Sequence, residues 1–168
     1  HYLYNAYPTV EFANDTPGGT LIPNSNALIG KLAVSAVGND DITFEDTTGT
    51  ITFQLAVTRA DETGNDTLTL KNADGDVLYT TTTVEFGTTT EFQAVFDSTE
   101  FTVPAGETKY LYVYADTADF EDTGDSIQLW IDAATDDIDW SINGNNASYS
   151  HGDLIFQGNK YGGALNKS

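Results

Sequence analysis

Large apolar residues alternate with polar residues and one alanine along Ile51–Thr58, and this period of two constrains the fold more than any other feature. Successive side chains of a β-strand point to opposite faces, whereas a helix brings side chains back to one face about every 3.6 residues. Ile51, Phe53, Leu55 and Val57 therefore share one face, and the residues between them share the other. The pattern predicts a strand with one face in a hydrophobic core.

The same alternation recurs along the chain at intervals of roughly 8–12 residues, which is typical of an antiparallel β-sandwich. In Thr108–Ala115, aliphatic residues hold one face and three tyrosines the other, and Ser126–Asp132 separates Ile127, Leu129 and Ile131 from Trp130 in the same way. We therefore expect an all-β fold, an immunoglobulin-like or jelly-roll-like sandwich of eight to ten strands. Further strands are expected at Leu28–Val37 (with Leu28, Leu32, Val34 and Ala36 inward), Leu68–Lys71, Val77–Thr80, Phe92–Phe96, Asp136–Ile142 and Leu154–Phe156.

The chain divides into three parts by composition. Residues 1–19 form an apolar, aromatic arm and a hinge, with no charge before Glu11 and with turn residues from Asn14 to Gly19. Residues 20–157 form the sandwich, and 158–168, with three glycines and two lysines, form an expected flexible tail. The arm is either an edge strand of its own domain or a strand that completes the sheet of a neighbouring subunit. Its contact residues would be Tyr2, Leu3, Tyr4, Ala6, Tyr7, Val10 and Phe12.

Charge and composition exclude several classes of function. The 168 residues include 26 acidic and 6 basic ones, a formal net charge of −20, so nucleic acid is a poor partner. There is no cysteine and no apolar run long enough to span a membrane. Because the chain starts at His1 rather than methionine, we expect a processed N-terminus and a secreted or cell-surface location. Four Asn-X-Ser/Thr triplets are candidate glycosylation sites: Asn14, Asn65, Asn146 and Asn166.

The strongest candidate surface is aromatic. Tyr110, Tyr112 and Tyr114 share the face of one strand, and together with Trp130 on the next strand they could form a cross-strand ladder. Three interpretations remain open: an ordinary outward sheet face, a face covered by another subunit or by the arm, and a platform on which sugar rings stack.

Acidic loops offer oxygen ligands for calcium. The loop after the tyrosine strand carries Asp116, Asp119, Glu121, Asp122 and Asp125. A second group is Asp61, Glu62 and Asp66. The ordered twelve-residue calcium-loop pattern is absent, so solvated negative loops are the alternative.

Catalytic motifs are missing from the sequence, and we expect a protein that is not an enzyme. The one enzymatic alternative is a copper site formed by the amino group and imidazole of His1 together with His151. This arrangement resembles the histidine brace of lytic polysaccharide monooxygenases, which are copper enzymes with an immunoglobulin-like sandwich.

Residues Thr20–Trp140 resemble acidic, threonine-rich surface modules of bacteria and archaea. The segments that carry the resemblance are Leu21–Pro23, Leu32–Ala36, Phe101–Lys109, Tyr112–Thr117 and Gly124–Leu129. Such modules are immunoglobulin-type sandwiches of surface layers and filaments. A single module with an apolar N-terminal arm also resembles pilin or matrix-fibre subunits that assemble by donor-strand exchange. The chain lacks the long hydrophobic helix of type IV pilins and the cysteine pair common in chaperone-assembled ones.

These observations lead to one expected function and two alternatives. We expect a structural subunit of an extracellular filament or surface layer that assembles head to tail through its N-terminal arm, with itself as partner and with calcium as the one candidate ligand. The alternatives are a carbohydrate-binding surface module and a copper oxidase that uses His1.

Overall fold

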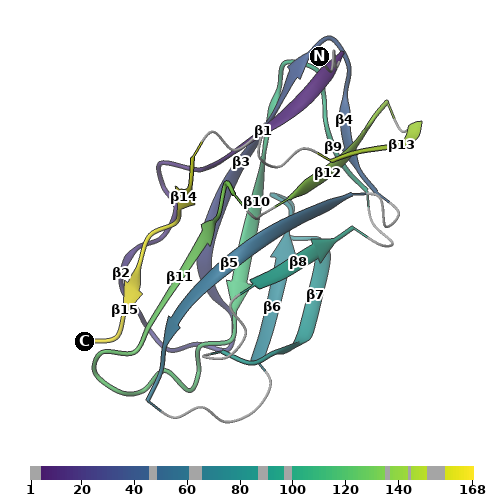
Figure 1. Ribbon diagram of the computed structural model, residues 1–168. Coiled ribbons are helices and arrows are strands. Elements are labelled where there is room, and N and C mark those ends of the chain that lie inside the picture. The colour runs from purple at the N-terminus through teal and green to yellow at the C-terminus, as the bar shows by residue number, and fades with distance from the viewer. Residues whose placement is uncertain are drawn as a thin grey trace.

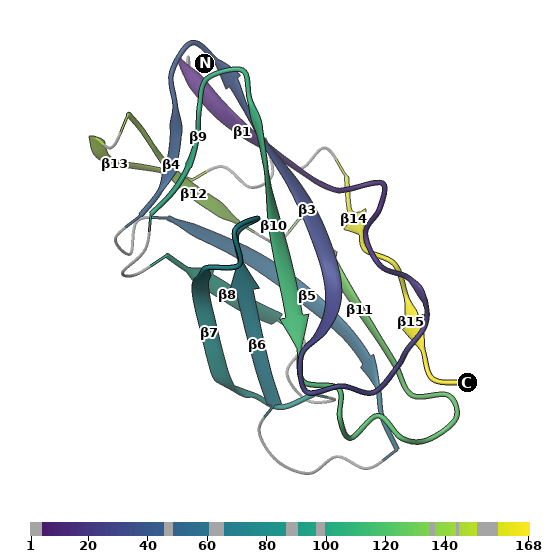
Figure 2. The same cartoon turned by 180° about the vertical axis from the view of Figure 1, so that it is seen from behind.

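The computed structural model describes residues 5–45, 49–60, 66–86, 91–96, 100–134, 137–143, 145–150 and 158–168; for Thr83 and residues 145–150 it describes the backbone alone. These ranges contain strands, turns and loops but no helix, which confirms the all-β prediction. Figure 1 looks onto one sheet from outside with a second sheet behind it, and Figure 2 shows the reverse side.

The smaller sheet has five strands in the order β1-β3-β10-β6-β7, all antiparallel to their neighbours. Its members are β1 (Ala6–Phe12), β3 (Ala27–Gly38), β10 (Thr108–Ala115), β6 (Asp66–Lys71) and β7 (Val77–Val84).

The larger sheet has ten strands, and its main path runs β2-β15-β11-β5-β12-β4-β9. These strands are β2 (Gly19–Thr20), β15 (Leu165–Asn166), β11 (Ser126–Ile131), β5 (Thr50–Thr58), β12 (Ile138–Ile142), β4 (Ile42–Phe44) and β9 (Phe101–Val103). Beside them, β8 (Glu91–Val95) pairs with β5, β13 (Asn145–Ser150) with β12, and β14 (Lys160–Tyr161) with β11. The β2–β15 pair is parallel, and the other pairs described are antiparallel.

Interrupted strands explain why the sheets hold more strands than the expected eight to ten. β12 pairs with both β4 and β5, so these two continue one another across the sheet. β8 pairs with β5 and β9 pairs with β4, so β8 and β9 also continue one another, on the other side of β5 and β4. The interruption between β4 and β5 therefore lies beside the interruption between β8 and β9. We call this line of interrupted strand pairing in the larger sheet the seam.

The core lies between the two sheets and follows the predicted alternation. Leu111, Val113 and Ala115 of β10 are at most 1% exposed, and Ile127, Leu129 and Ile131 of β11 are fully buried. Ile51, Phe53 and Leu55 of β5 are buried as well, but so are Thr52 and Gln54 of the face predicted to point outward, at 5% and 9% exposed. The period-two pattern was therefore sufficient to assign the inward faces of these strands.

One inward residue was predicted wrongly. In β3 the register against β10 shifts between Val113 and Tyr114, so that Gly30 pairs with Val113 and Leu28 with Tyr114. This β-bulge reverses the alternation before Gly30, and Ile29 rather than Leu28 is fully buried. Leu28 turns outward, where it lines a surface groove.

Residues near both ends of the chain pair with strands of the sandwich. Residues 6–12 pair with β3 of the same chain over seven positions, and Ala6 and Val10 are buried in the core. Within the expected flexible tail, β14 and β15 both pair with β11, and Leu165 is 6% exposed. Hydrophobic contacts and sheet hydrogen bonds therefore join both segments to the sandwich.

A tight turn joins the last two strands of the smaller sheet. The Asp74-Gly75 turn joins β6 and β7 as a hairpin, with Gly75 at a φ of 90°. In the ranges that the structure covers, no helix has the length and apolar character needed to cross a membrane.

Candidate functional site

The N-terminal strand β1 lies at the end of the five-stranded sheet. Its inward residues Ala6, Pro8 and Val10 are buried, whereas Tyr7 is 40% exposed. Of the expected arm residues, Ala6, Tyr7, Val10 and Phe12 therefore belong to the chain's own sheet; Tyr2, Leu3 and Tyr4 lie outside the described residues. Asn5 also contacts its own chain, because its carbonyl accepts the N–H of Asn39 at 3.2 Å. The candidate contact for a neighbour is therefore the segment before Asn5.

Pro8 protects the free edge of β1. Its partner Ala36 uses both of its backbone polar groups on the β10 side, donating to the Glu107 carbonyl and accepting from the Gly106 N–H. Ala36 and Pro8 are therefore a pair without hydrogen bonds between them, and in such a pair Pro8 directs its backbone groups away from β3. Because proline has no N–H, the open edge of β1 lacks a hydrogen-bond donor at Pro8, and this interrupts pairing with another strand.

The tyrosine face of β10 lies on the outside of the five-stranded sheet and is associated with lysines. Lys31 Nζ lies 4.6 Å from the ring centre of Tyr110 and 5.5 Å from that of Tyr112, and Lys71 Nζ lies 4.9 Å from that of Tyr114. Such cation–π contacts hold the rings against the sheet. Because cations cover these rings, they are poorly placed to stack on a sugar.

Lys31 also holds the turn that follows β1. Its Nζ donates a hydrogen bond of 2.7 Å to Asp15 Oδ2. This bond lowers the pKa of Asp15 from its ordinary 3.8 and raises the pKa of Lys31 from its ordinary 10.5. The contribution of Asp15 to stability is therefore present above its unfolded pKa and is lost as the pH falls through the folded pKa. That of Lys31 is present below its unfolded pKa and is lost as the pH rises through the higher folded value.

We expect the Asp15 carboxyl to titrate with a midpoint below 3.8 in the native chain, as measured by carbon-detected NMR. In Lys31→Gln the midpoint should return toward that of an ordinary aspartate, because the neutral amide no longer favours the carboxylate. Lys71→Gln is the matched control, since Lys71 contacts Tyr114 instead. A native midpoint at or above 3.8 would contradict the pairing.

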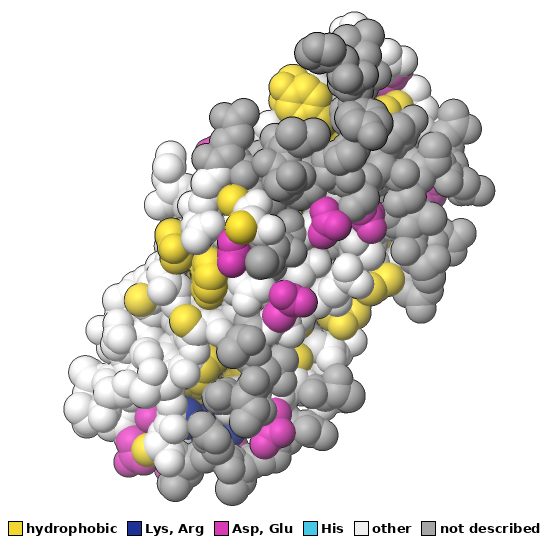
Figure 3. Space-filling model, in the orientation of Figure 1, with side chains coloured by type: hydrophobic (Ala, Val, Ile, Leu, Met, Phe, Trp, Pro, Cys, Tyr) yellow, Lys and Arg dark blue, Asp and Glu magenta, His cyan; other side chains and the backbone are white. Residues whose placement is uncertain are grey.

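The expected ladder between the tyrosines and Trp130 does not form. β10 and β11 belong to different sheets, so Trp130 lies on the opposite side of the molecule from the tyrosine face. There it stacks on Tyr161 of β14, with ring centres 5.5 Å apart and planes 13° from parallel. Tyr161 is 55% exposed. Figure 3 shows this side of the molecule, over which acidic side chains are spread and little dark blue is visible.

Side chains of the acidic loop serve the loop's own structure. Asp125 is 3% exposed, and its two carboxylate oxygens accept the N–H groups of Ala60 and Asp122. Asp119, Glu121 and Asp122 are exposed. Among the described residues, no group of three or more His, Cys, Asp or Glu side chains is placed to hold a metal ion. Asp61 and Glu62 lie outside the described residues, and the calcium site stays a prediction.

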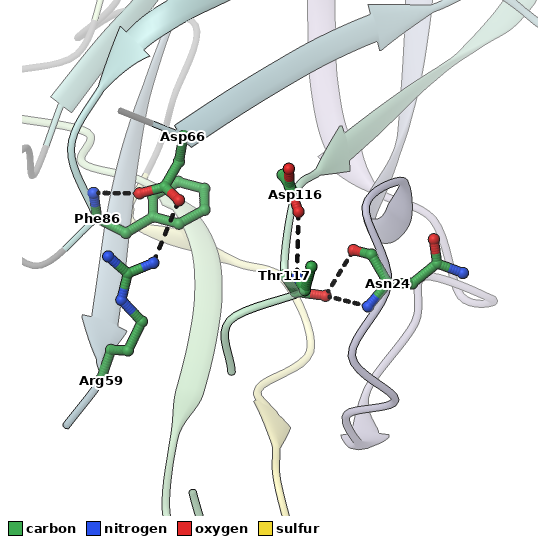
Figure 4. Close-up of polar contacts among 7 residues, drawn as sticks. Asn24, Arg59, Asp66, Phe86, Asp116 and Thr117 are labelled. Carbon is green, nitrogen blue, oxygen red and sulfur yellow. Dashed lines mark hydrogen bonds and ion pairs between the residues drawn. The ribbon is translucent and has the colours of Figure 1, made fainter. Parts of the chain in front are cut away.

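Thr117 and Arg59, which sequence reasoning did not single out, make buried polar contacts that hold neighbouring segments together (Figure 4). Thr117 is fully buried; its N–H and its hydroxyl both donate to the Asn24 carbonyl, and the hydroxyl accepts the Asn24 N–H. Arg59 Nη1 lies 3.2 Å from Asp66 Oδ1 in a buried ion pair, and Asp66 Oδ2 accepts the N–H of Phe86. The sequence gives no local signal for the Thr117–Asn24 contact, because its partners are 93 residues apart. Arg59 and Asp66 are seven residues apart, but only the placement of β5 and β6 in different sheets shows that their ion pair is buried.

A groove of about 410 Å³ opens beside β2, at the edge of the larger sheet. It is lined by Pro17, Gly18, Thr20, Leu21, Ile22, Asn24, Asn26, Ala27, Leu28 and Leu165, none of which is charged or aromatic. Ile22 is 76% exposed, whereas Leu21 and Leu165 are buried beneath. This combination of an open strand edge and an uncharged lining is the most distinctive surface feature of so acidic a chain.

The remaining predicted sites are tested little by the structure. Asn14 and Asn166 are exposed, as a glycan acceptor requires; Asn65 lies outside the described residues, as does the side chain of Asn146. His1 and His151 both lie outside the described residues, so the copper hypothesis stays a prediction.

Comparisons with known proteins give no family. No protein-family model matches the chain, and no curated protein matches its sequence. The chain is thus an all-β protein with two sheets, and no specific family, pilin-like or otherwise, is identified for it.

Proposed function

We propose that this chain is a structural subunit of an extracellular filament or surface layer, and that it assembles head to tail by β-strand complementation through its N-terminal segment. One observation supports this more than any other. β1 begins beside Gly38, the last residue of β3, whereas the uncharged groove is lined by Ala27 and Leu28 at the start of β3. β3 runs along much of the length of the molecule in both views (Figures 1 and 2), so the N-terminal segment and the groove lie toward opposite ends.

A contact between two different surfaces at opposite ends does not close on itself, and so it grows a fibre or a layer. The segment before β1 carries Tyr2, Leu3 and Tyr4, which supply apolar side chains and main-chain hydrogen-bonding groups for a neighbour. The net charge of −20 limits lateral bundling of the assembled fibres. A secreted or cell-surface location and self-association as the main partnership belong to this proposal.

Purified protein is expected to form fibres or sheets, visible by negative-stain electron microscopy, and to assemble more as salt is added. The physical reason is screening: the distance over which charges repel falls from about 10 Å at 0.1 M salt to about 3 Å at 1 M. Sedimentation velocity over this range measures the assembled fraction. Calcium chloride at matched ionic strength is the control that separates bridging by calcium from simple screening.

A monodisperse monomer at every salt concentration would contradict the proposal. In that case the carbohydrate-binding alternative gains weight, because the Trp130–Tyr161 stack holds a half-exposed ring in a fixed orientation. Retention of the monomer on insoluble polysaccharide, and its loss in Tyr161→Ala, would then support the binding module.

A further inference from the structure

We infer that the groove beside β2 is the docking site for the N-terminal residues His1–Tyr4 of a second copy, which add to the larger sheet along β2. The inference rests on the proposed function and names the surface through which assembly occurs. Its occupant is a segment of this same chain, supplied by the next subunit.

Contacts within the chain fix the floor and one wall of the groove. Its floor consists of Leu21 and Leu165, which are 3% and 6% exposed. One wall is the loop at Asn24, which Thr117 holds with three hydrogen bonds of 2.8–3.1 Å. A second anchor is the turn formed where the N–H of Asn26 donates to the side chain of Asn24. A fixed wall lowers the entropy that docking a short segment would otherwise lose.

The edge of β2 offers main-chain groups to an added strand. Gly19 and Leu21 donate their N–H groups to the carbonyls of Ala164 and Asn166, on the β15 side. Alternate residues of a strand direct their backbone groups to opposite sides, so those of Thr20 face away from β15 and toward the groove that Thr20 lines. β2 ends the sheet on this side, and an extended segment can continue it.

The groove and the segment match in their lack of charge. Every residue that lines the groove is uncharged, and no Asp, Glu, Lys or Arg occurs before Glu11. In a chain with 26 acidic residues, this surface is where the uncharged side chains of Tyr2, Leu3 and Tyr4 lose the least free energy by desolvation. Ile22, 76% exposed at the rim, is the apolar side chain that gains most from being covered.

The occupant must come from another molecule. Ala6 pairs with Gly38 at one end of β3, whereas Ala27 and Leu28 at the other end line the groove. The twelve-residue length of β3 separates these ends by about 36 Å, at about 3.3 Å per residue. Five extended residues span at most about 18 Å. Residues 1–5 therefore cannot reach the groove of their own chain.

Engineered disulfides test this contact directly, because the native chain has no cysteine. With Leu3→Cys and Ile22→Cys in one chain, mild oxidation is expected to give a ladder of covalent multimers on a non-reducing gel. The matched control carries Leu3→Cys with Val77→Cys, since Val77 is 49% exposed but lies on β7, the far edge strand of the smaller sheet. The control should stay largely monomeric. Equal ladders in both, or no ladder in either, would overturn the docking site.

A second set of variants separates this inference from the proposed function. Removal of residues 1–4 takes away the docking segment and should lower the assembled fraction by roughly tenfold or more. Ile22→Asp should have an effect of the same size, because the docked segment would bury an unpaired carboxylate. Val77→Asp should assemble as the native chain does, and thermal unfolding would verify that each variant is folded. If the native chain assembles, Ile22→Asp assembles equally well and removal of residues 1–4 prevents assembly, the groove is wrong and the proposed function stands. If removal of residues 1–4 also leaves assembly unchanged, the N-terminal segment is not the contact and both are wrong. If the native chain never assembles, both are wrong.

Discussion

Asp66→Ala is expected to lower the free energy of unfolding by about 3–5 kcal/mol, because it leaves a buried cation without its carboxylate. The Arg59 side chain is 1% exposed, and in the described part of the chain its Nε and Nη2 have no hydrogen-bond partner. Asp66 supplies the ion pair at 3.2 Å and also accepts the N–H of Phe86. Alanine removes both contacts and places no other acceptor there.

The ring of Phe120 cannot replace the lost charge. It lies 5.6 Å from the Arg59 guanidinium and packs edge-on against Phe86 at 5.9 Å, so the cation is enclosed by apolar rings. For a chain of this length, each kcal/mol shifts the melting temperature by about 2–4 °C, so the expected fall is roughly 6–20 °C. Denaturant unfolding followed by tryptophan fluorescence gives the free energy, and calorimetry gives the temperature.

Two matched variants make this result specific. Asp66→Asn should fall between the native chain and Asp66→Ala, because its amide oxygen can still accept the Phe86 N–H while the charge is lost. Asp74→Ala removes an exposed carboxylate from the β6–β7 turn and should change the free energy by less than about 0.5 kcal/mol. A loss in Asp66→Ala as small as that in Asp74→Ala would refute the importance of the ion pair.

Phe44→Ala is the second large expected effect, again about 3–5 kcal/mol, because it opens a cavity in the core. Phe44 is fully buried, and its ring centre lies 5.4 Å from that of Phe96 and 6.0 Å from that of Phe101. These three rings lie where β4, β8 and β9 end or begin, at the seam across the larger sheet. They fill the space where strand pairing is interrupted.

Phe44→Leu is the control for the cavity, since a leucine keeps most of the volume and should lose less than about 1.5 kcal/mol. Denaturant unfolding of both variants, with unchanged m-values, measures the difference. If Phe44→Ala is no less stable than Phe44→Leu, the surrounding rings have collapsed into the space and the seam is more plastic than its packing indicates.

Strand positions and their inward faces could be predicted because they are local properties. The alternation in Ile51–Thr58 and Thr108–Ala115 reports directly which side chains avoid water, and burial of Ile51, Phe53 and Leu111 confirms it. Where the backbone departs from regular alternation, prediction failed. The bulge at Ile29 arises from the register of β3 against β10. The neighbouring Gly30 is a local signal, since a glycine inside a strand often marks a bulge, but it does not fix which residue turns inward.

The candidate site was less predictable, because it depends on which segments meet. The tyrosines and Trp130 are close in sequence, yet the chain crosses from one sheet to the other between them and Trp130 stacks on Tyr161. Thr117 and Asp125 resemble ordinary loop residues, but burial gives them anchoring roles. The groove joins residues 17–28 to Leu165 and so exists only after the last strand has paired.

The sequence by itself determined the all-β class, the faces of the strands, and the acidic, cysteine-free character of the molecule. These follow from side-chain period and charge, which act over a few residues. Tertiary structure alone decided that β1 lies in its own sheet, that the C-terminal segment is paired, and that Arg59 finds Asp66. The strand pairings join segments that are distant in the sequence. The ion pair of Arg59 with Asp66, seven residues later, depends on how β5 and β6 are placed in different sheets.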